Sequence, residues 1–439
     1  MLLAGSYYFY MSWKPEYAAL LLLSTAIDFW CGLKMGRIKE KKKRKPFLAI
    51  SLIGNLGMLF FFKYFNFFSL NINDGLGMLG VDYTPAFYSI ILPLGISFYT
   101  FQTMSYSIDL YNGNIKPETH FGYFALYVSF FPQLIAGPIE RSSHLIPQLK
   151  KNVTPKMEDI RYGLNKIALG FFKKLVVADS VSVFVDFVFV DLSVSNGAQV
   201  SMALVFFAIQ SFADFSGYTD IAIGSARLMG IKLIENFNRP YWVRNFRDFW
   251  SRWHMSLTQW IFIYLQTPLL GKRRTQFRAF WVNILVLGVI GFWHGATWPF
   301  IFFGVGHGII MGIQLFIEYD PRFPVVKNQL YQRLFRPLWN MTLLCLLVLM
   351  YRSQTVDDII VGYSKIFTDF SFSYSDIISG FNSNTAFYSM AGATMLLIPT
   401  IFFNRELKFK SNLLYLLVVF GLIMLIGQDA RQQFLYFQF

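Results

Sequence analysis

Apolar runs of close to 20 residues recur along the chain, separated by short polar or basic segments. A helix needs about 20 apolar residues to cross a bilayer. Only helices and closed barrels satisfy their backbone groups in lipid, and the runs here are continuous instead of alternating as barrel strands do. The pattern therefore predicts an all-α polytopic membrane protein.

We predict about ten or eleven transmembrane helices together with short re-entrant or interfacial helices. The apolar segments that supply these spans and shorter helices are expected at residues 17–33, 47–69, 86–109, 122–136, 159–190, 198–213, 218–230, 279–293, 298–317, 337–351, 384–403 and 411–427. A shorter helix is expected near 355–368, and the polar string DFSGY is expected to separate 198–213 from 218–230. Several runs are broken by Gly, Pro or charge, and irregular backbone at membrane depth needs protein or water around it. We therefore expect a central funnel or tunnel.

The composition supports a single membrane domain over residues 1–439. Of the 439 residues 55% are hydrophobic and 15% charged, whereas soluble domains carry about 25% charged residues. No polar stretch is long enough for a separate soluble domain. The first residues are apolar but too short for a full span, and they lack the features of a cleavable signal peptide.

The net charge of +14 resides largely in short basic segments at 36–46, 271–278 and 404–410, which are expected to be loops. Such segments follow the positive-inside rule and attract anionic headgroups, so the expected partner is the lipid bilayer and not nucleic acid. Cys31 and Cys345 both lie in apolar surroundings and are expected to be free thiols.

Three of the five histidines fall in the stretch 236–308, namely His254, His294 and His307. An ionisable residue inside a membrane segment suggests a functional site. His294 follows more than ten apolar positions, and the flanking Gly291 and Gly295 allow another backbone or a substrate to approach closely. An imidazole can accept a proton from a hydroxyl near neutral pH. The alternative is a packed, hydrogen-bonded structural histidine.

His254 belongs to the cationic and aromatic segment FRDFWSRWHMSLTQW. Helical spacing pairs Asp248 with Arg252. The segment either lies at the membrane interface or forms a wall on which Arg252 binds a phosphate-bearing donor bidentately. His307 stands between two glycines, which favours a role in helix packing over catalysis.

Other polar residues in apolar context are expected to bond neighbouring helices or to line a path to His294. They are Gln102, Asp109, Gln133, Asp214, Ser216, Tyr218 and Asp220. The histidines lack metal-ligand spacing, so no metal is expected. The strings that mark a bound nucleotide or a serine nucleophile are missing from the sequence.

Long strings resemble the membrane-bound O-acyltransferase family and, within it, the alginate O-acetylase group. They are LPLGISFYTFQTMSYSIDLY, YVSFFPQLIAGPIERSSHLIPQL, DFSGYTDIAIGSARLMGIKLIENFNRPY, RDFWSRWHMSLTQW and GFWHGATWPFIFFGVGHG, within about residues 91–312. The resemblance implies that His294 occupies the family's invariant histidine position and His254 its second, less fixed one. Where alginate-type members show Arg-Asp, this chain has Phe262 and Ile263, so that segment is expected to meet a different donor or partner.

The resemblance implies an O-acyltransferase, multi-pass in the bacterial cytoplasmic membrane. It would move an acyl group, expected to be acetyl, from a cytoplasmic thioester (acetyl-CoA or an acyl carrier) to hydroxyls of an extracytoplasmic polysaccharide or to a partner transferase. His294 would be the general base and His254 would position a substrate, with no bound cofactor. The expected substrate-binding residues are Arg252, Asp248, Trp253, Gln133, Asp214, Tyr218, Trp293 and Asn236.

Alternatives remain open. A transporter or flippase would use the same polar cavity without chemistry, and a scaffold subunit would only anchor an extracytoplasmic partner. Teichoic acid and peptidoglycan are alternative acceptors.

Overall fold

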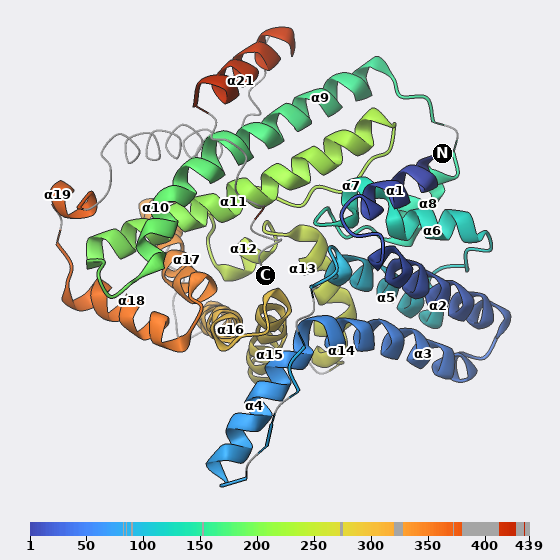
Figure 1. Cartoon of the computed structure of the whole chain (residues 1–439), viewed down its shortest axis with the longest axis horizontal. Helices are drawn as coiled ribbons and strands as arrows, with labels where there is room; N and C mark the ends of the chain where they lie inside the picture. The colour runs from blue at the N-terminus through green and yellow to red at the C-terminus, as the bar shows by residue number, and fades with distance from the viewer. Residues whose placement is uncertain are drawn as a thin grey trace. The chain divides into compact units, whose positions relative to one another are not determined.

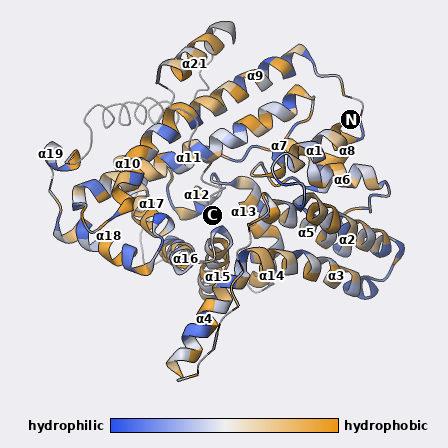
Figure 2. Ribbon diagram, viewed as in Figure 1, coloured by the Kyte–Doolittle hydropathy of each residue, from blue (hydrophilic) through white to orange (hydrophobic). Residues whose placement is uncertain are grey.

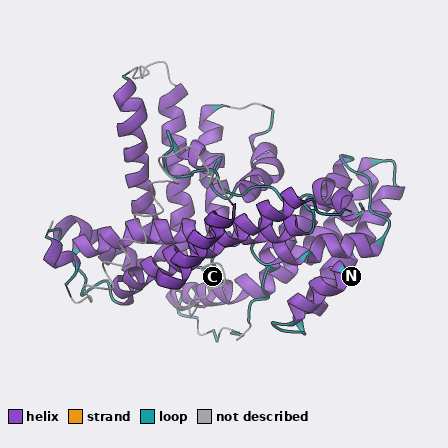
Figure 3. Ribbon diagram, turned by 90° about the horizontal axis from the view of Figure 1, so that it is seen from above, coloured by secondary structure: helices purple, strands orange, loops and turns teal. Residues whose placement is uncertain are grey.

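A computed structural model describes residues 1–379, apart from 82, 85, 89–90, 152, 273–274, 320–327 and 372, together with 412–426 and 434. The regular structure of these residues is helical (Figure 3), which confirms the predicted all-α class. The chain forms two compact units. The first comprises Met1–Lys156 and Ala226–Ile234, and the second Met157–Ser225 and Glu235–Phe439.

The first unit contains the blue and teal helices of Figure 1. Their bounds are α1 (Leu2–Met11), α2 (Tyr17–Arg37), α3 (Lys41–Leu59), η1 (Phe60–Tyr64), α4 (Phe65–Met78), α5 (Ile96–Asn112), α6 (Phe121–Ser129), α7 (Phe131–Leu134) and α8 (Ser142–Leu149). Helices α2, α3 and α5 pack on one another around buried polar residues. The Asp28 carboxylate accepts hydrogen bonds from Ser51 at 2.5 Å and from Asn55 at 2.8 Å. Such bonds join helices where water is absent.

The second unit begins with α9 and includes α11 up to Ser225. The bounds are α9 (Met157–Phe171), η2 (Phe172–Ala178), α10 (Asp179–Val190), α11 (Gly197–Leu228), α12 (Phe246–Trp250), α13 (Met255–Ile261), η3 (Phe262–Gln266), α14 (Thr267–Leu270), α15 (Gln276–His294), α16 (Trp298–Tyr319), η4 (Tyr331–Phe335), α17 (Arg336–Arg352), α18 (Val356–Thr368), α19 (Tyr374–Ile377) and α21 (Asn412–Ile426). Helices α15 and α16 form a closely packed hairpin, and α17 packs against α16.

Six helices in the described part of the chain are long and apolar enough to cross a membrane, which agrees with the predicted membrane class. They are Tyr17–Arg37, Lys41–Met78, Gly197–Leu228, Gln276–His294, Trp298–Glu318 and Tyr331–Arg352. Figure 2 shows apolar residues along the helices of both units. The prediction of ten or eleven spans also counted shorter helices such as α5, α6 and α21, and the segment 384–403, which lies outside the described residues.

Two predicted breaks differ from the structure. Helix α3 begins at Lys41, so the basic residues of 36–46 are largely helical. Helix α11 runs without interruption from Gly197 to Leu228, so the expected break at DFSGY is wrong. The carboxylates of α11 are tolerated because lysines neutralise them. Lys174 contacts Asp214 at 2.8 Å, and Asp220 is likewise paired with lysine.

Candidate functional site

The α15–α16 hairpin places two of the three central histidines. Helix α15 starts at its cap Thr275, whose side chain accepts from the Arg278 amide, and it ends at His294. A Cβ added to Gly291 would lie 2.1 Å from the Phe300 carbonyl oxygen, and the two backbones also meet at Gly304. Only glycine permits this approach, which confirms the expectation that Gly291 admits a neighbouring backbone.

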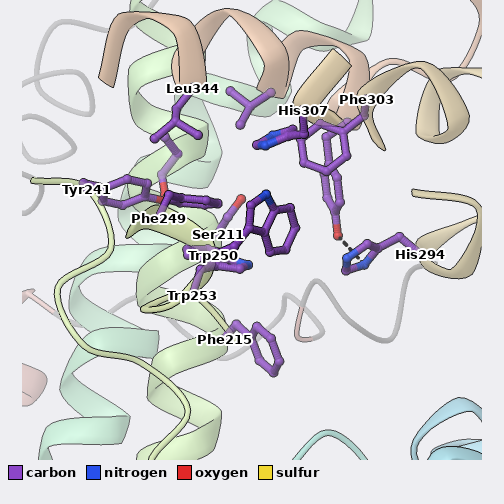
Figure 4. A pocket seen from close by; sticks show the side chains of 13 residues that line it. Ser211, Phe215, Tyr241, Phe249, Trp250, Trp253, His294, Phe303, His307 and Leu344 are labelled. Carbon is purple, nitrogen blue, oxygen red and sulfur yellow. Dashed lines mark hydrogen bonds between the residues drawn. The ribbon is translucent and has the colours of Figure 1, made fainter. Parts of the chain in front are cut away.

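A pocket lies within the second unit. Its lining side chains, shown in Figure 4, are mostly aromatic or aliphatic. They are Ala208, Ser211, Phe215, Tyr241, Phe249, Trp250, Trp253, His294, Phe303, His307, Leu344, Val348 and Tyr351. The two predicted site residues His294 and Trp253 are therefore brought together at one pocket. His294 itself is 7% exposed.

The His294 imidazole is held from one side by Tyr351 at the end of α17. The Tyr351 hydroxyl lies 3.4 Å from Nδ1 of His294, the contact drawn as a dashed line in Figure 4. The two rings meet edge-on at 5.3 Å, and the Trp293 ring lies 4.9 Å from His294. When Nδ1 carries the proton and donates it to the tyrosine oxygen, Nε2 becomes the basic nitrogen of the neutral ring.

His254 lies just outside the pocket lining, in a strained backbone conformation. It precedes α13 with φ +44° and ψ +53°, the left-handed region that non-glycine residues seldom adopt. Its Nδ1 is 3.1 Å from the Asn236 side-chain oxygen, which also accepts from the amide and hydroxyl of Ser256. Asn236 is thus placed as a support for His254, and its predicted contact with substrate stays a prediction.

Burial lowers the pKa of His254 to about 3, so the ring is neutral at physiological pH. Its ring centroid is 6.2 Å from that of Trp293 and 4.8 Å from that of Phe215, which lines the pocket. Trp293 therefore contacts both predicted catalytic histidines.

The remaining predicted substrate residues lie apart from the pocket lining. Asp248 and Arg252 form the expected pair at 2.8 Å, although α12 ends at Trp250 and Arg252 lies in the turn that follows it. Asp214 is buried in its ion pair, and the Tyr218 ring packs on Phe434 at 5.1 Å. Gln133 belongs to the first unit, where it donates to the Tyr127 carbonyl. Their roles toward substrate stay predictions.

Two of the pocket residues that the sequence analysis did not assign to the site bear directly on it, namely His307 and Tyr351. His307 was expected to serve helix packing, and it does pack on aromatic rings such as Phe246 and Phe303, yet it also lines the pocket. Tyr351 lies 57 positions beyond His294, and nothing local in its surrounding sequence predicts the contact. The one feature of the local sequence that marks Tyr351 is a hydroxyl group at the end of an apolar run.

Cys31 and Cys345 are free thiols, as predicted. Among the described residues, no group of three or more His, Cys, Asp or Glu side chains is arranged to hold a metal ion.

The chain matches a known protein family over more than half of its length. Residues 118–353 match the model of MBOAT, the membrane-bound O-acyltransferase family. The chain is 33% identical to the probable alginate O-acetylase AlgI of Azotobacter vinelandii over 86% of its own length and 74% of that protein. It is 37% identical to the peptidoglycan O-acetyltransferase of Helicobacter pylori over 71% of its own length and 63% of that protein. It is 30% identical to the teichoic acid D-alanyltransferase of Bacillus subtilis over 53% of its own length and 61% of that protein.

Proposed function

Because the chain belongs to the membrane-bound O-acyltransferase family and is an O-acyltransferase, we propose that His294 is its general base. The acyl group, acetyl in this proposal, passes from a cytoplasmic thioester to a hydroxyl of an extracytoplasmic polysaccharide. The observation that carries the proposal is the position of the His294 imidazole, which lines an apolar pocket while Tyr351 contacts its Nδ1.

The proposed reaction is a balanced acyl exchange. Nε2 of His294 takes the proton of the acceptor hydroxyl as its oxygen attacks the thioester carbonyl carbon. The resulting tetrahedral intermediate collapses, the carbon–sulfur bond breaks, and the proton passes from the imidazolium to the leaving thiolate. An ester and a free thiol result. General-base help of this kind contributes about 10²–10⁴-fold, and alignment of the two substrates supplies much of the remaining acceleration.

The other residues take supporting roles in this proposal. Tyr351 and Trp293 fix the His294 ring, and Trp253 forms part of the pocket wall. His254, held neutral by burial and oriented by Asn236, positions a substrate beside Trp293. Arg252 is the candidate for a phosphate-bearing part of the donor, since a guanidinium binds phosphate oxygens bidentately.

The proposed acceptor is a polysaccharide because the match to the probable alginate O-acetylase of A. vinelandii covers 86% of the chain, against 53% for the teichoic acid D-alanyltransferase of B. subtilis. Peptidoglycan is the second candidate, given the similarity to the H. pylori enzyme. An extracytoplasmic transferase is the proposed partner, and the bacterial cytoplasmic membrane the proposed location.

The test uses inverted membrane vesicles, which expose the cytoplasmic face, and a thioester carrying a radiolabelled acetyl group. Wild-type vesicles should convert the label into hydroxylamine-sensitive ester on enclosed glycan. His294→Ala should abolish the ester, and His120→Asn, a change at an exposed histidine that caps α6, should retain it. A transporter would instead carry unreacted label inward in both variants, and that outcome would overturn the proposal.

A further inference from the structure

The pocket has a second polar position besides His294. His307 of α16 and Trp250 of α12 both line it, are 1% and 6% exposed, and have ring centroids 5.4 Å apart. Among the described residues, neither His307 Nδ1 nor Trp250 Nε1 has a hydrogen-bond partner. A buried polar atom left in this state destabilises the fold. Two such atoms on one pocket wall therefore suggest that a ligand supplies the missing partner.

Aromatic side chains surround the two nitrogens. Phe303 lies 4.5 Å from the His307 ring, and Phe249 lies 5.9 Å from His307 and 5.4 Å from Trp250. Figure 4 shows His307 and His294 as separate labelled members of the lining. Two aromatic rings lie between the two histidines. Tyr351 packs on His294 and on Phe303, and Phe303 in turn packs on His307. The second polar position is therefore distinct from the proposed base.

The chemistry of the pair defines what it binds. An indole N–H only donates, so the ligand atom beside Trp250 must be an acceptor. An imidazole can donate to the same oxygen through Nδ1. The surrounding wall is apolar, and a sugar ring would bury several hydroxyls there without partners. A slender arm with one carbonyl oxygen between hydrocarbon segments satisfies both conditions.

We propose that His307 and Trp250 form a carbonyl-binding subsite for the arm of the acyl donor, recognising an amide oxygen some distance from the thioester. The inference rests on the proposed function, because it assumes a thioester donor in this pocket. Loss of either donor group should weaken binding of an amide-bearing arm about tenfold, as expected for one hydrogen bond.

Two thioesters of equal length test the subsite in inverted membrane vesicles. S-acetyl-N-acetylcysteamine carries an amide in its arm, and S-pentyl thioacetate replaces that amide with hydrocarbon. Trp250→Phe and His307→Phe keep an aromatic ring at each position and remove the nitrogens. In each variant the ratio of kcat/KM for the amide thioester to that for the hydrocarbon thioester should fall about tenfold. Trp281→Phe, at a tryptophan that is 54% exposed on α15, should leave the ratio unchanged.

A ratio that stays constant while both kcat/KM values fall together would indicate a structural role and overturn the subsite. A photoreactive diazirine beside the amide of the corresponding thioether gives a second measurement on the wild-type protein. Label in α12 or α16 supports the subsite, and label confined to other helices overturns it. Failure of the proposed function looks different, because His294→Ala would then still transfer acetyl, or the wild type would turn over neither thioester.

Discussion

At position 351 a tyrosine hydroxyl meets Nδ1 of His294 at 3.4 Å, so one oxygen atom helps to decide which nitrogen carries the proton. A neutral imidazole has one donor and one acceptor nitrogen. If the tyrosine oxygen accepts from Nδ1, then Nε2 is free to act as the base. Without that oxygen, the His294 imidazole would occupy both tautomers and more than one ring orientation.

Tyr351→Phe should therefore lower kcat by about 10–100-fold, a part of the general-base contribution, and leave KM for the donor nearly unchanged. Steady-state kinetics in vesicles would measure both constants. Tyr363→Phe is the matched control, because that hydroxyl donates to the Leu346 carbonyl and its residue is not part of the pocket lining. Equal effects of the two changes would contradict the role assigned to Tyr351.

His254 makes stability depend on pH. Its pKa is about 3 in the folded protein and 6.5 when unperturbed, so between these values the unfolded chain binds more protons. Its neutral ring therefore contributes stability that is fully present above about pH 6.5 and is lost progressively as the pH falls toward about 3. The melting temperature of the wild type should drop more between about pH 7 and pH 5 than that of His254→Gln. Parallel curves for the two proteins would exclude this explanation.

The residues of the site were predictable to different degrees. His294 and His254 could be found because an imidazole in an apolar run is conspicuous in the sequence. His307 is equally conspicuous, but its flanking glycines indicated only a role in helix packing. The structure shows that one side chain can both pack between helices and line the pocket. Tyr351 could not be found, because its contact with His294 depends on how α17 packs and not on local sequence.

Among the elements, the α15–α16 hairpin was the most accurately predicted. The expected spans 279–293 and 298–317 compare with Gln276–His294 and Trp298–Tyr319. Helix α11 was predicted as two pieces because its aspartates were judged in isolation. Their lysine partners come from η2 and, for Asp220, also from α9, and no periodicity in α11 itself reveals them.

The hairpin depends on backbone contact at its glycines. Gly291→Val should separate α15 from α16, because even a Cβ would lie 2.1 Å from the Phe300 carbonyl oxygen. We expect destabilisation by about 1–3 kcal/mol or more, as in overpacked cores, together with loss of acyl transfer as His294 moves. Gly57→Ala is the control, since nothing lies within 4 Å of the added Cβ. Unfolding in detergent and transfer in vesicles measure the two effects, and tolerance of valine would refute this explanation.

The ion pairs that join η2 to α10 and α11 should differ strongly from surface pairs. Lys174 contacts both Asp179 and Asp214 and is 5% exposed. Lys174→Met should destabilise the protein by about 3–5 kcal/mol, because buried carboxylates lose their cation. Lys365→Met breaks the more exposed pair with Asp369 and should change stability by less than about 1 kcal/mol. Similar midpoints for both variants in a denaturant titration would show that the buried pairs do not hold these helices together.

For the whole molecule, composition and run length were sufficient to predict a helical membrane protein. The number of spans was less predictable, because α5 has 17 residues and α6 only 9, and length alone does not decide whether such helices cross the membrane. The two compact units have no signal in the sequence, since residues 226–234 belong with a segment that ends about 70 positions earlier. The expectation of one membrane domain over 1–439 stays a prediction.

The account depends on acyl transfer to a glycan outside the cytoplasm. The most direct test measures alkali-labile acetate on extracytoplasmic glycans of cells that lack the gene and are complemented with wild type, His294→Ala or His120→Asn. We expect the wild type and His120→Asn to restore the acetate, and His294→Ala to leave it at the level of the deletion. Normal acetylation with His294→Ala present at wild-type amounts in the membrane would contradict the account.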